Sequence, residues 1–143
     1  GAGEAAQGIL GTANWHWELP DEGTKAFAKS YAKEYGFPPS QAAQTCYAQQ
    51  LLYANAVETA GTFYPPEVIK ALEGFQFDGL GVGPTEYRKG DHQCFKDVLV
   101  VRGKENPSGK WDMLEIVQVV PRSQVEYPDS LGGGELGPYD VQA

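Results

Sequence analysis

The chain has 143 residues, of which 41% are hydrophobic and 12% aromatic, the size and composition of one folded domain and not of a disordered tail. Its formal net charge is −8, with 11 Lys and Arg scattered among 19 Asp and Glu. That charge argues against a nucleic-acid partner, which clustered basic residues would bind, and against adhesion to an anionic membrane. The longest apolar run, residues 98–101, is too short to span a membrane.

The first half of the chain has the capping residues and the periodicity of three helices. The first is predicted to follow Asp21 as its N-cap and to end at Gly36, with aromatic residues at four-residue spacing: Phe27, Tyr31 and Tyr35. The second is predicted from residues 38–40 to Ala60, stopped by Gly61, with an apolar face made of Ala43, Tyr47, Leu51, Ala54 and Val57. The third is predicted to begin at residues 65–66 and to end before Gly74, with Val68, Ile69 and Leu72 on its apolar face.

Strands are predicted on both sides of these helices. Residues 7–15 suit a short strand that leads into the aromatic cluster Trp15-His16-Trp17. Residues 95–102 and 111–120 are predicted to pair as a hairpin, because turn-forming residues at 106–109 separate them. The glycine-punctuated stretch 74–94 and the tail 122–143 are predicted to be irregular.

This layout contains fewer strands than its helices require. Amphipathic helices of this type normally cover a parallel sheet, whose strands need crossover connections, and most of that sheet is missing here. One interpretation is a small stand-alone α+β interaction domain. The interpretation that we favour is the last part of a larger two-lobed α/β protein.

Five segments carry a resemblance to a known family, and they follow one another in that family's order: 27–39, 43–48, 54–62, 67–73 and 88–93. In these segments, the chain resembles the branched-chain amino acid type of periplasmic solute-binding protein, the extracytoplasmic receptors of ATP-driven importers. The match covers residues 7–120, and its most characteristic part is Arg88 followed by Asp91-His92-Gln93.

The resemblance implies an α/β fold that is part of the type I periplasmic-binding-protein fold, in which two doubly wound lobes are joined by three crossings. It implies that residues 1–17 form a strand of the C-terminal lobe and a crossing, and that 18–82 form helices of the N-terminal lobe. Residues 83–93 would be a hinge crossing, 94–121 the hairpin of the C-terminal lobe, and 122–143 an irregular tail.

The same resemblance implies function and partners. We expect a receptor for an amino acid, amide or related small organic solute, working in the periplasm with the permease of an ABC transporter and without a cofactor. We also expect a fragment, whose apolar helix faces are covered by the N-terminal remainder of the protein, as a companion chain, or by an intertwined oligomer. A signal peptide is expected to lie outside this chain.

Five residues are candidates for contacting the solute. Trp15 and Trp17 have amphipathic rings that suit a pocket wall, and as the last residues of a strand they would face one side and His16 the other. The resemblance implies a further contact from the start of the second helix, among Ala43, Gln44 and Tyr47, where free N–H groups favour an acceptor. The alternatives are packing of the two tryptophans beneath the lobes and a core position for Tyr47.

Arg88, Asp91, His92 and Gln93 admit two interpretations. In an enzyme, His92 would act as a base beside Cys94, but in an extended chain Asp91 and His92 face opposite sides and no third group is evident. We therefore expect a hinge network and no catalytic residue.

Two further possibilities concern the histidines and cysteines. A zinc site made from His16, Cys46, His92 and Cys94 has suitable ligand types but not the usual spacing, and we expect no metal. Cys46 and Cys94 either pair in an oxidising compartment or remain two buried free thiols, and we favour the thiols.

Overall fold

The structure is a computed structural model and describes residues 3–81, 83–128 and 131. It confirms the predicted helices as α1 (Glu22–Tyr35), α2 (Gln41–Ala60) and α3 (Pro65–Leu72). A short 3-10 helix (Gly3–Ala6) precedes them.

Side chains and glycines next to each helix account for where α1 and α2 begin and end. The carboxylate of Asp21 accepts a hydrogen bond from the Thr24 N–H at 2.8 Å, and the hydroxyl of Ser40 accepts one from the Ala43 N–H at 3.2 Å. At the other ends, Gly36 and Gly61 have φ values of 77° and 66°, a left-handed conformation that glycine adopts without a steric penalty.

The main sheet consists of β1 (Leu10–Ala13), β5 (Val98–Gly103) and β6 (Leu114–Val120), in the order β1-β5-β6 with antiparallel pairing. The β5–β6 pair confirms the predicted hairpin. The predicted strand 7–15 was too long, because the backbone turns at both of its ends. Gly8 has a positive φ of 72°, and the Leu19 N–H bonds to the His16 carbonyl across a turn.

A second small sheet lies in the stretch that was predicted to be irregular. It consists of β2 (Gln76–Phe77), β3 (Thr85–Tyr87) and β4 (Cys94–Phe95), again antiparallel. These strands are too short for an alternating pattern to be visible in the sequence. The tail contains a short helix, α4 (Arg122–Val125), while residues 129–130 and 132–143 of the predicted irregular tail lie outside the described residues.

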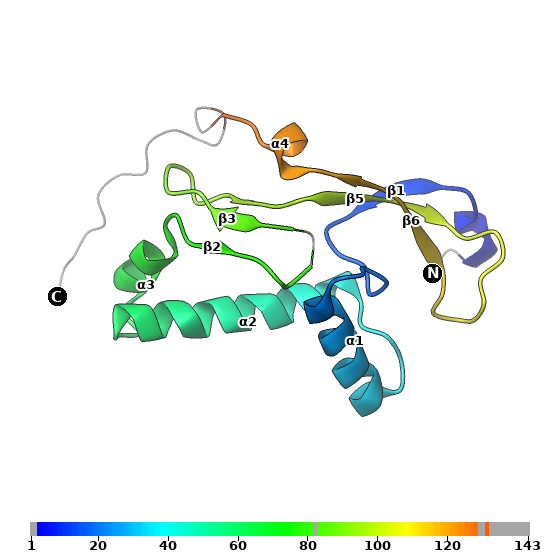
Figure 1. The fold of residues 1–143 in the computed structure, drawn as a ribbon, viewed down its shortest axis with the longest axis horizontal. Helices are drawn as coiled ribbons and strands as arrows, with labels where there is room; N and C mark the ends of the chain where they lie inside the picture. The colour runs from blue at the N-terminus through cyan, green and yellow to red at the C-terminus, as the bar shows by residue number, and fades with distance from the viewer. Residues whose placement is uncertain (1–2, 82, 129–130, 132–143) are drawn as a thin grey trace.

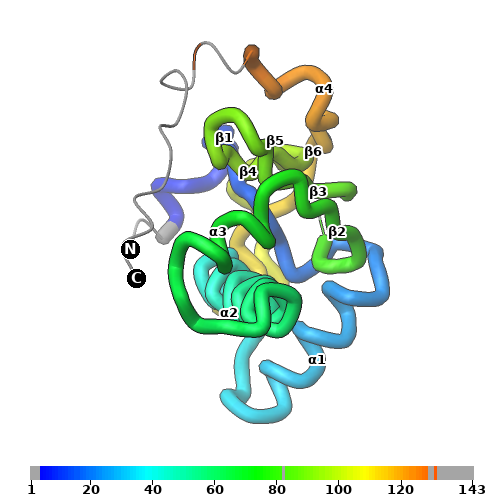
Figure 2. The backbone as a smooth tube through the Cα atoms, turned by 90° about the vertical axis from the view of Figure 1, so that its left-hand side faces the viewer, coloured from blue at the N-terminus to red at the C-terminus, as the bar shows by residue number. Residues whose placement is uncertain are grey.

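The helices α1–α3 lie on one side of the strands, with β2 and β3 between α2 and the upper part of the molecule (Figure 1). Figure 2, which looks along α2, shows α3 beside it and the strands above. The hydrophobic core lies where β1 crosses toward α1, and its buried members are Trp15, Leu19, Leu99 and Val101.

The buried face of α2 differs from the predicted one. The residues facing inward are Gln44, Ala48, Leu52 and Ala56, while Tyr47 and Leu51 of the predicted face are 43% and 45% exposed. The predicted helix is therefore correct, but the predicted buried face of that helix is wrong. Because α2 carries apolar residues around most of its circumference, the segments packed against it decide which side is buried.

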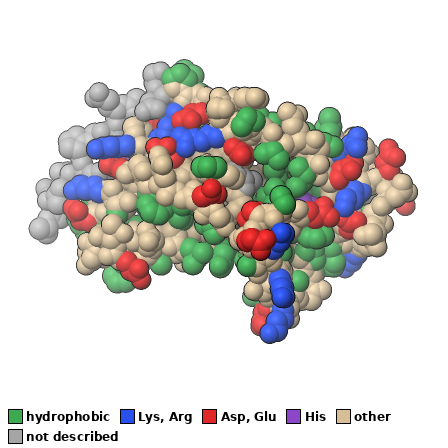
Figure 3. All heavy atoms as spheres, viewed as in Figure 1, with side chains coloured by type: hydrophobic (Ala, Val, Ile, Leu, Met, Phe, Trp, Pro, Cys, Tyr) green, Lys and Arg blue, Asp and Glu red, His purple; other side chains and the backbone are tan. Residues whose placement is uncertain are grey.

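The surface mixes both signs of charge, and Figure 3 shows acidic and basic side chains interspersed on this face with hydrophobic patches between them. None of the helices in the described ranges is long and apolar enough to span a membrane.

Candidate functional site

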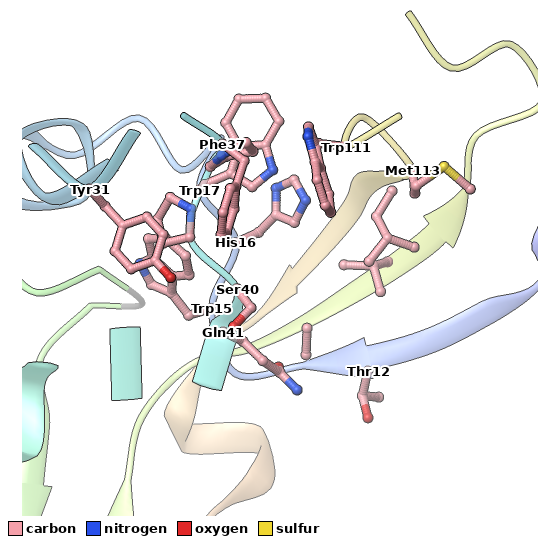
Figure 4. A pocket seen from close by; sticks show the side chains of 15 residues that line it. Thr12, Trp15, His16, Trp17, Tyr31, Phe37, Ser40, Gln41, Trp111 and Met113 are labelled. Atoms are coloured by element: carbon pink, nitrogen blue, oxygen red, sulfur yellow. The ribbon is translucent and has the colours of Figure 1, made fainter. Parts of the chain in front are cut away.

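A cavity of about 400 Å³ opens beside the segment that follows β1, between the main sheet, the α1–α2 connection and the loop that leads into β6 (Figure 4). Aromatic and aliphatic side chains make up most of its wall. It is lined by Thr12, Ala13, Trp15, His16, Trp17, Tyr31, Phe37, Pro38, Pro39, Ser40, Gln41, Val101, Trp111, Met113 and Leu114. No Asp, Glu, Lys or Arg is present among these described lining residues.

Trp15 forms the buried floor of this region and is fixed from two sides. Its indole Nε1 donates a hydrogen bond to Thr24 Oγ1 at 3.0 Å, and both residues are buried. Its ring meets Phe27 edge to face, with the two ring centroids 5.9 Å apart. The segment after β1 is therefore anchored to the first turns of α1.

His16 lines the same cavity as Trp15 and Trp17, so the expectation that it faces the opposite side was wrong. The alternation of an extended strand does not apply, because β1 ends at Ala13 and the following residues turn. His16 Nδ1 accepts a hydrogen bond from the Glu18 N–H at 3.3 Å. Burial lowers the pKa of the imidazole, with a smaller opposing effect from the Glu18 carboxylate.

Two rings distant in sequence complete the aromatic wall. Phe37, in the α1–α2 connection, stacks on Trp111 with ring centroids 5.2 Å apart and an interplanar angle of 28°. Trp111 was predicted to begin a strand, but β6 begins at Leu114, and Trp111 lies in the preceding loop. The side chain of Asp112 holds this loop by bonding Lys104 and Ser108, and the Lys104 ammonium keeps the pKa of the Asp112 carboxyl well below its usual range.

The candidates at the start of α2 lie beside the cavity and do not line it. Gln44 is only 4% exposed and donates a hydrogen bond from Nε2 to the Leu80 carbonyl at 2.7 Å. Tyr47 stacks on Phe27, with ring centroids 4.5 Å apart. Ala43 is partly buried, and its N–H is bound by the Ser40 cap.

The lining from this region comes from residues 38–41, just before and at the start of the helix. The Pro38-Pro39-Ser40 run was recognised only as a helix start. Because these residues directly follow the aromatic Phe37, which also lines the cavity, the sequence did contain a signal that they could border a binding site.

Arg88 and Asp91 form a buried, two-pronged ion pair. Arg88 Nε donates to Asp91 Oδ1 at 3.1 Å, and the second guanidinium nitrogen donates to Oδ2. This contact holds the pKa of the Asp91 carboxyl below its usual value. The guanidinium also lies over the Phe95 ring, 4.4 Å from its centroid, and donates to the Tyr127 carbonyl.

The backbone between these partners is a tight turn. The His92 N–H bonds to the Arg88 carbonyl and the Arg88 N–H to the Gln93 carbonyl, each at 2.9 Å. His92 has a φ of 56°, so the chain here is not extended. The expectation that Asp91 and His92 face opposite sides assumed an extended chain. Its Nε2 lies 3.0 Å from Glu73 Oε1.

The surroundings of the Cys94 thiol do not activate it as a nucleophile. Although Cys94 is exposed as a whole residue, partial burial of its sulfur raises the pKa of the thiol, which disfavours the thiolate. Cys46 and Cys94 are both free, and both are exposed where buried positions were expected. Within the described residues, no three His, Cys, Asp or Glu side chains gather as metal ligands.

Comparisons with known proteins place this geometry in a family. The model of the family described as periplasmic binding protein matches residues 1–110. A comparison with curated proteins finds no match.

Solved structures with similar folds include a branched-chain amino acid ABC transporter periplasmic ligand-binding protein from Burkholderia xenovorans LB400. It is 27% identical, with a TM-score of 0.76, over 87% of this chain and 33% of that chain. An amino acid ABC transporter substrate-binding protein from Pseudomonas fluorescens Pf-5 is 23% identical, with a TM-score of 0.79, over 94% of this chain and 36% of that chain.

A solute binding protein of an ABC transporter from Rhodopseudomonas palustris BisB5, solved in complex with 3,4-dihydroxybenzoic acid, shares the fold at 19% identity. Its TM-score is 0.71, over 84% of this chain and 32% of that chain. The chain thus spans about a third of the length of the structures that it matches. Since the family model covers most of its residues, the chain belongs to the periplasmic binding protein family and contains part of the type I fold of that family.

Proposed function

We propose that this chain is the C-terminal part of an extracytoplasmic receptor that binds an amino acid, amide or related small organic solute and delivers it to an ABC transporter. The observation that carries the proposal is the aromatic cavity at the chain crossing, in a chain of this family. Small-molecule sites are concave and mostly apolar, with a few polar groups that set orientation. Such a receptor needs no catalysis, because closure of its lobes around the solute is the signal that a permease reads.

Within this proposal, Trp15 and Trp17 form the solute-facing wall. Tyr47 supports that wall from behind through its stack on Phe27. Gln44 remains a candidate contact, because its Oε1 is buried and has no hydrogen-bond partner among the described residues. Asn14 Oδ1 and Thr45 Oγ1 are likewise buried and have no hydrogen-bond partner among the described residues.

The turn at Arg88 and Asp91 is proposed as a hinge element. Its ion pair joins β3 to β4, and its bond to the Tyr127 carbonyl ties the segment after α4 to the same point. A buried pair with fixed geometry suits a pivot, which has to keep its shape while the lobes move.

The remainder of the receptor is proposed to supply the rest of both lobes, as the preceding part of one polypeptide, a companion chain or an intertwined oligomer. In this proposal it covers apolar side chains that are exposed in this chain, among them Ile9 and Leu10, 63% and 64% exposed, on the β1 side of the sheet. The proposed location is the periplasm.

A thermal-shift screen of the complete receptor tests the function. Amino acids, amides and aromatic acids are added singly, and a selective rise in melting temperature is the expected result. The variant Trp111→Ala removes a cavity wall and should reduce the rise. Phe63→Ala removes an exposed ring on the α2–α3 connection and should leave the rise unchanged. A flat response across a broad panel would overturn the proposal.

A further inference from the structure

We infer that the cavity holds a flat, uncharged ring of the solute and that His16 donates the hydrogen bond that selects among such rings. The inference rests on the proposed function and goes further, because it names the chemical class of the solute and a specificity-determining residue.

The first argument is the charge of the wall. The described lining residues include no carboxylate, ammonium or guanidinium group. A zwitterionic amino-acid head group placed here would lose its hydration without gaining a counter-ion, which is strongly unfavourable. An uncharged group has no such cost, so the part of the wall that this chain supplies suits an uncharged part of the solute, and a charged end would be placed against other residues.

The second argument is shape. Two ring pairs contribute flat faces: Phe37 with Trp111, and His16 with Trp17 at a centroid distance of 5.5 Å and an angle of 31°. Aromatic faces and edges favour a planar ring over a branched aliphatic group of equal area, because ring quadrupoles add to the apolar contact. The volume of about 400 Å³ accommodates a substituted six-membered ring.

The third argument is the state of His16. Since Nδ1 accepts the Glu18 N–H, the neutral imidazole carries its proton on Nε2. The ring is buried, and burial lowers its pKa and favours the neutral form. The Lys104 ammonium acts in the same direction, while the Glu18 and Asp112 carboxylates act against it.

Among the described residues, no hydrogen bond is made by His16 Nε2. Figure 4 shows the imidazole among the rings of Trp17, Phe37 and Trp111. A fixed N–H in an apolar wall favours a ring that bears an acceptor, such as a carbonyl or phenolic oxygen or a ring nitrogen.

The test uses the complete receptor and isothermal titration calorimetry with benzamide, benzoate, 4-hydroxybenzoate, nicotinamide, cyclohexanecarboxamide and L-leucine. We expect at least one aromatic probe to bind. The aromatic amides, benzamide and nicotinamide, should bind several-fold more tightly than the saturated amide cyclohexanecarboxamide. His16→Leu should weaken binding of the aromatic probes about tenfold, while His16→Gln, which keeps an N–H donor, should stay within about threefold of the wild type. Phe63→Leu serves as the unaffected control.

A second measurement does not depend on the folding of a variant. Long-range ¹H–¹⁵N spectra of the wild-type receptor report the His16 ring nitrogens, and the Nε2 resonance should move when the receptor is saturated with the tightest aromatic probe. Tight binding of L-leucine without any aromatic probe, an unshifted Nε2 signal, or unchanged affinity in a folded His16→Leu would overturn this inference and leave the proposed function standing. Binding of no compound in the broad thermal-shift panel would overturn both.

Discussion

At the scale of single residues, the Arg88–Asp91 pair is a buried ion pair in which two guanidinium nitrogens contact the two carboxylate oxygens. Both side chains are buried. The guanidinium of Arg88 donates hydrogen bonds to the Asp91 carboxylate and to the Tyr127 carbonyl. Breaking one side of a buried pair leaves a charge without compensation, which costs far more than breaking an exposed pair. The position of a polar residue therefore decides its energetic importance more than its type.

Replacing Arg88 by Met should lower the free energy of unfolding by about 3 kcal/mol, because the Asp91 carboxylate would stay buried without its partner. Arg102→Met is the matched control. Arg102 pairs with Glu115 on the surface, where their side chains are 47% and 40% exposed, and its loss should cost less than about 1 kcal/mol. Urea unfolding of the complete receptor measures both, and equal losses in the two variants would contradict the argument.

His16 should make stability depend on pH. Its pKa is lowered in the folded state from the unfolded value of 6.5, so the unfolded chain binds a proton first as the pH falls. The stability due to the neutral ring is therefore complete above pH 6.5 and is lost progressively below it. Unfolding free energies at pH 7.5 and 5.5 should differ more in the wild type than in His16→Gln. An identical pH dependence in both proteins would show that His16 does not contribute.

At the scale of elements, α1 and α2 end at glycines in the left-handed conformation, which terminate the two helices. A Cβ at Gly36 or Gly61 would meet no atom within 4 Å, so only the backbone conformation restricts those positions. The direction in which the chain leaves α1 sets the position of Phe37, and hence part of the cavity wall.

Gly36→Ala should destabilise the protein by about 1 kcal/mol, because an L side chain is strained at a φ of 77°. Gly109→Ala is the comparison: its Cβ also meets open space, and its φ is not in the left-handed region. That variant should be neutral or slightly stabilising. Melting curves of both variants test the difference, and a neutral Gly36→Ala would refute the conformational explanation.

At the scale of the whole molecule, segments distant in sequence meet closely around α1. The carbonyl oxygen of Gly79 would lie 1.6 Å from a Cβ at Gly23, and Gly81 packs against Trp15 and Thr24. The loop before β3 therefore reaches the first turn of α1 and Trp15 at the floor of the cavity.

Gly23→Ala should lower the melting temperature, although alanine is favoured over glycine in a helix by about 1 kcal/mol. The reason is the clash with the Gly79 backbone, which has to move. Gly11→Ala, in β1 with open space around its Cβ, should not have this effect. A Gly23→Ala variant as stable as the wild type would show that the backbone at Gly79 moves away from the new methyl group without an energetic penalty. Tryptophan fluorescence should also change in Gly23→Ala, because the loop contacts Trp15.

Residues 1–143 alone should associate or bind an apolar dye, because Ile9, Leu10, Tyr47, Leu51 and Tyr53 are exposed together with the other uncovered apolar side chains. If the proposed remainder of the receptor covers these surfaces, adding it should abolish dye binding and give a defined species. Size-exclusion chromatography with dye fluorescence measures this. A monodisperse monomer with a sharp cooperative melt and no dye binding would contradict the proposal that a further part covers these surfaces.

The helices, their ends and the β5–β6 hairpin were predictable from local sequence patterns, and the resemblance to the family is matched by the comparisons. Caps and turns depend on residues within about four positions of one another: Asp21 bonds to Thr24, and Ser40 to Ala43. Such contacts are readable from the chain because no distant segment takes part in them.

Three features follow from long-range packing: the buried side of α2, the orientation of His16, and the position of Trp111 beside the cavity. Each of these depends on a partner far away in sequence: Gln44 on Leu80, and Phe37 on Trp111. The aromatic cluster at residues 15–17 was a visible signal for a site, but a periodic pattern gives the period of an element and not the direction in which it faces. That direction follows from which segments pack together, because burial is a property of the assembled chain.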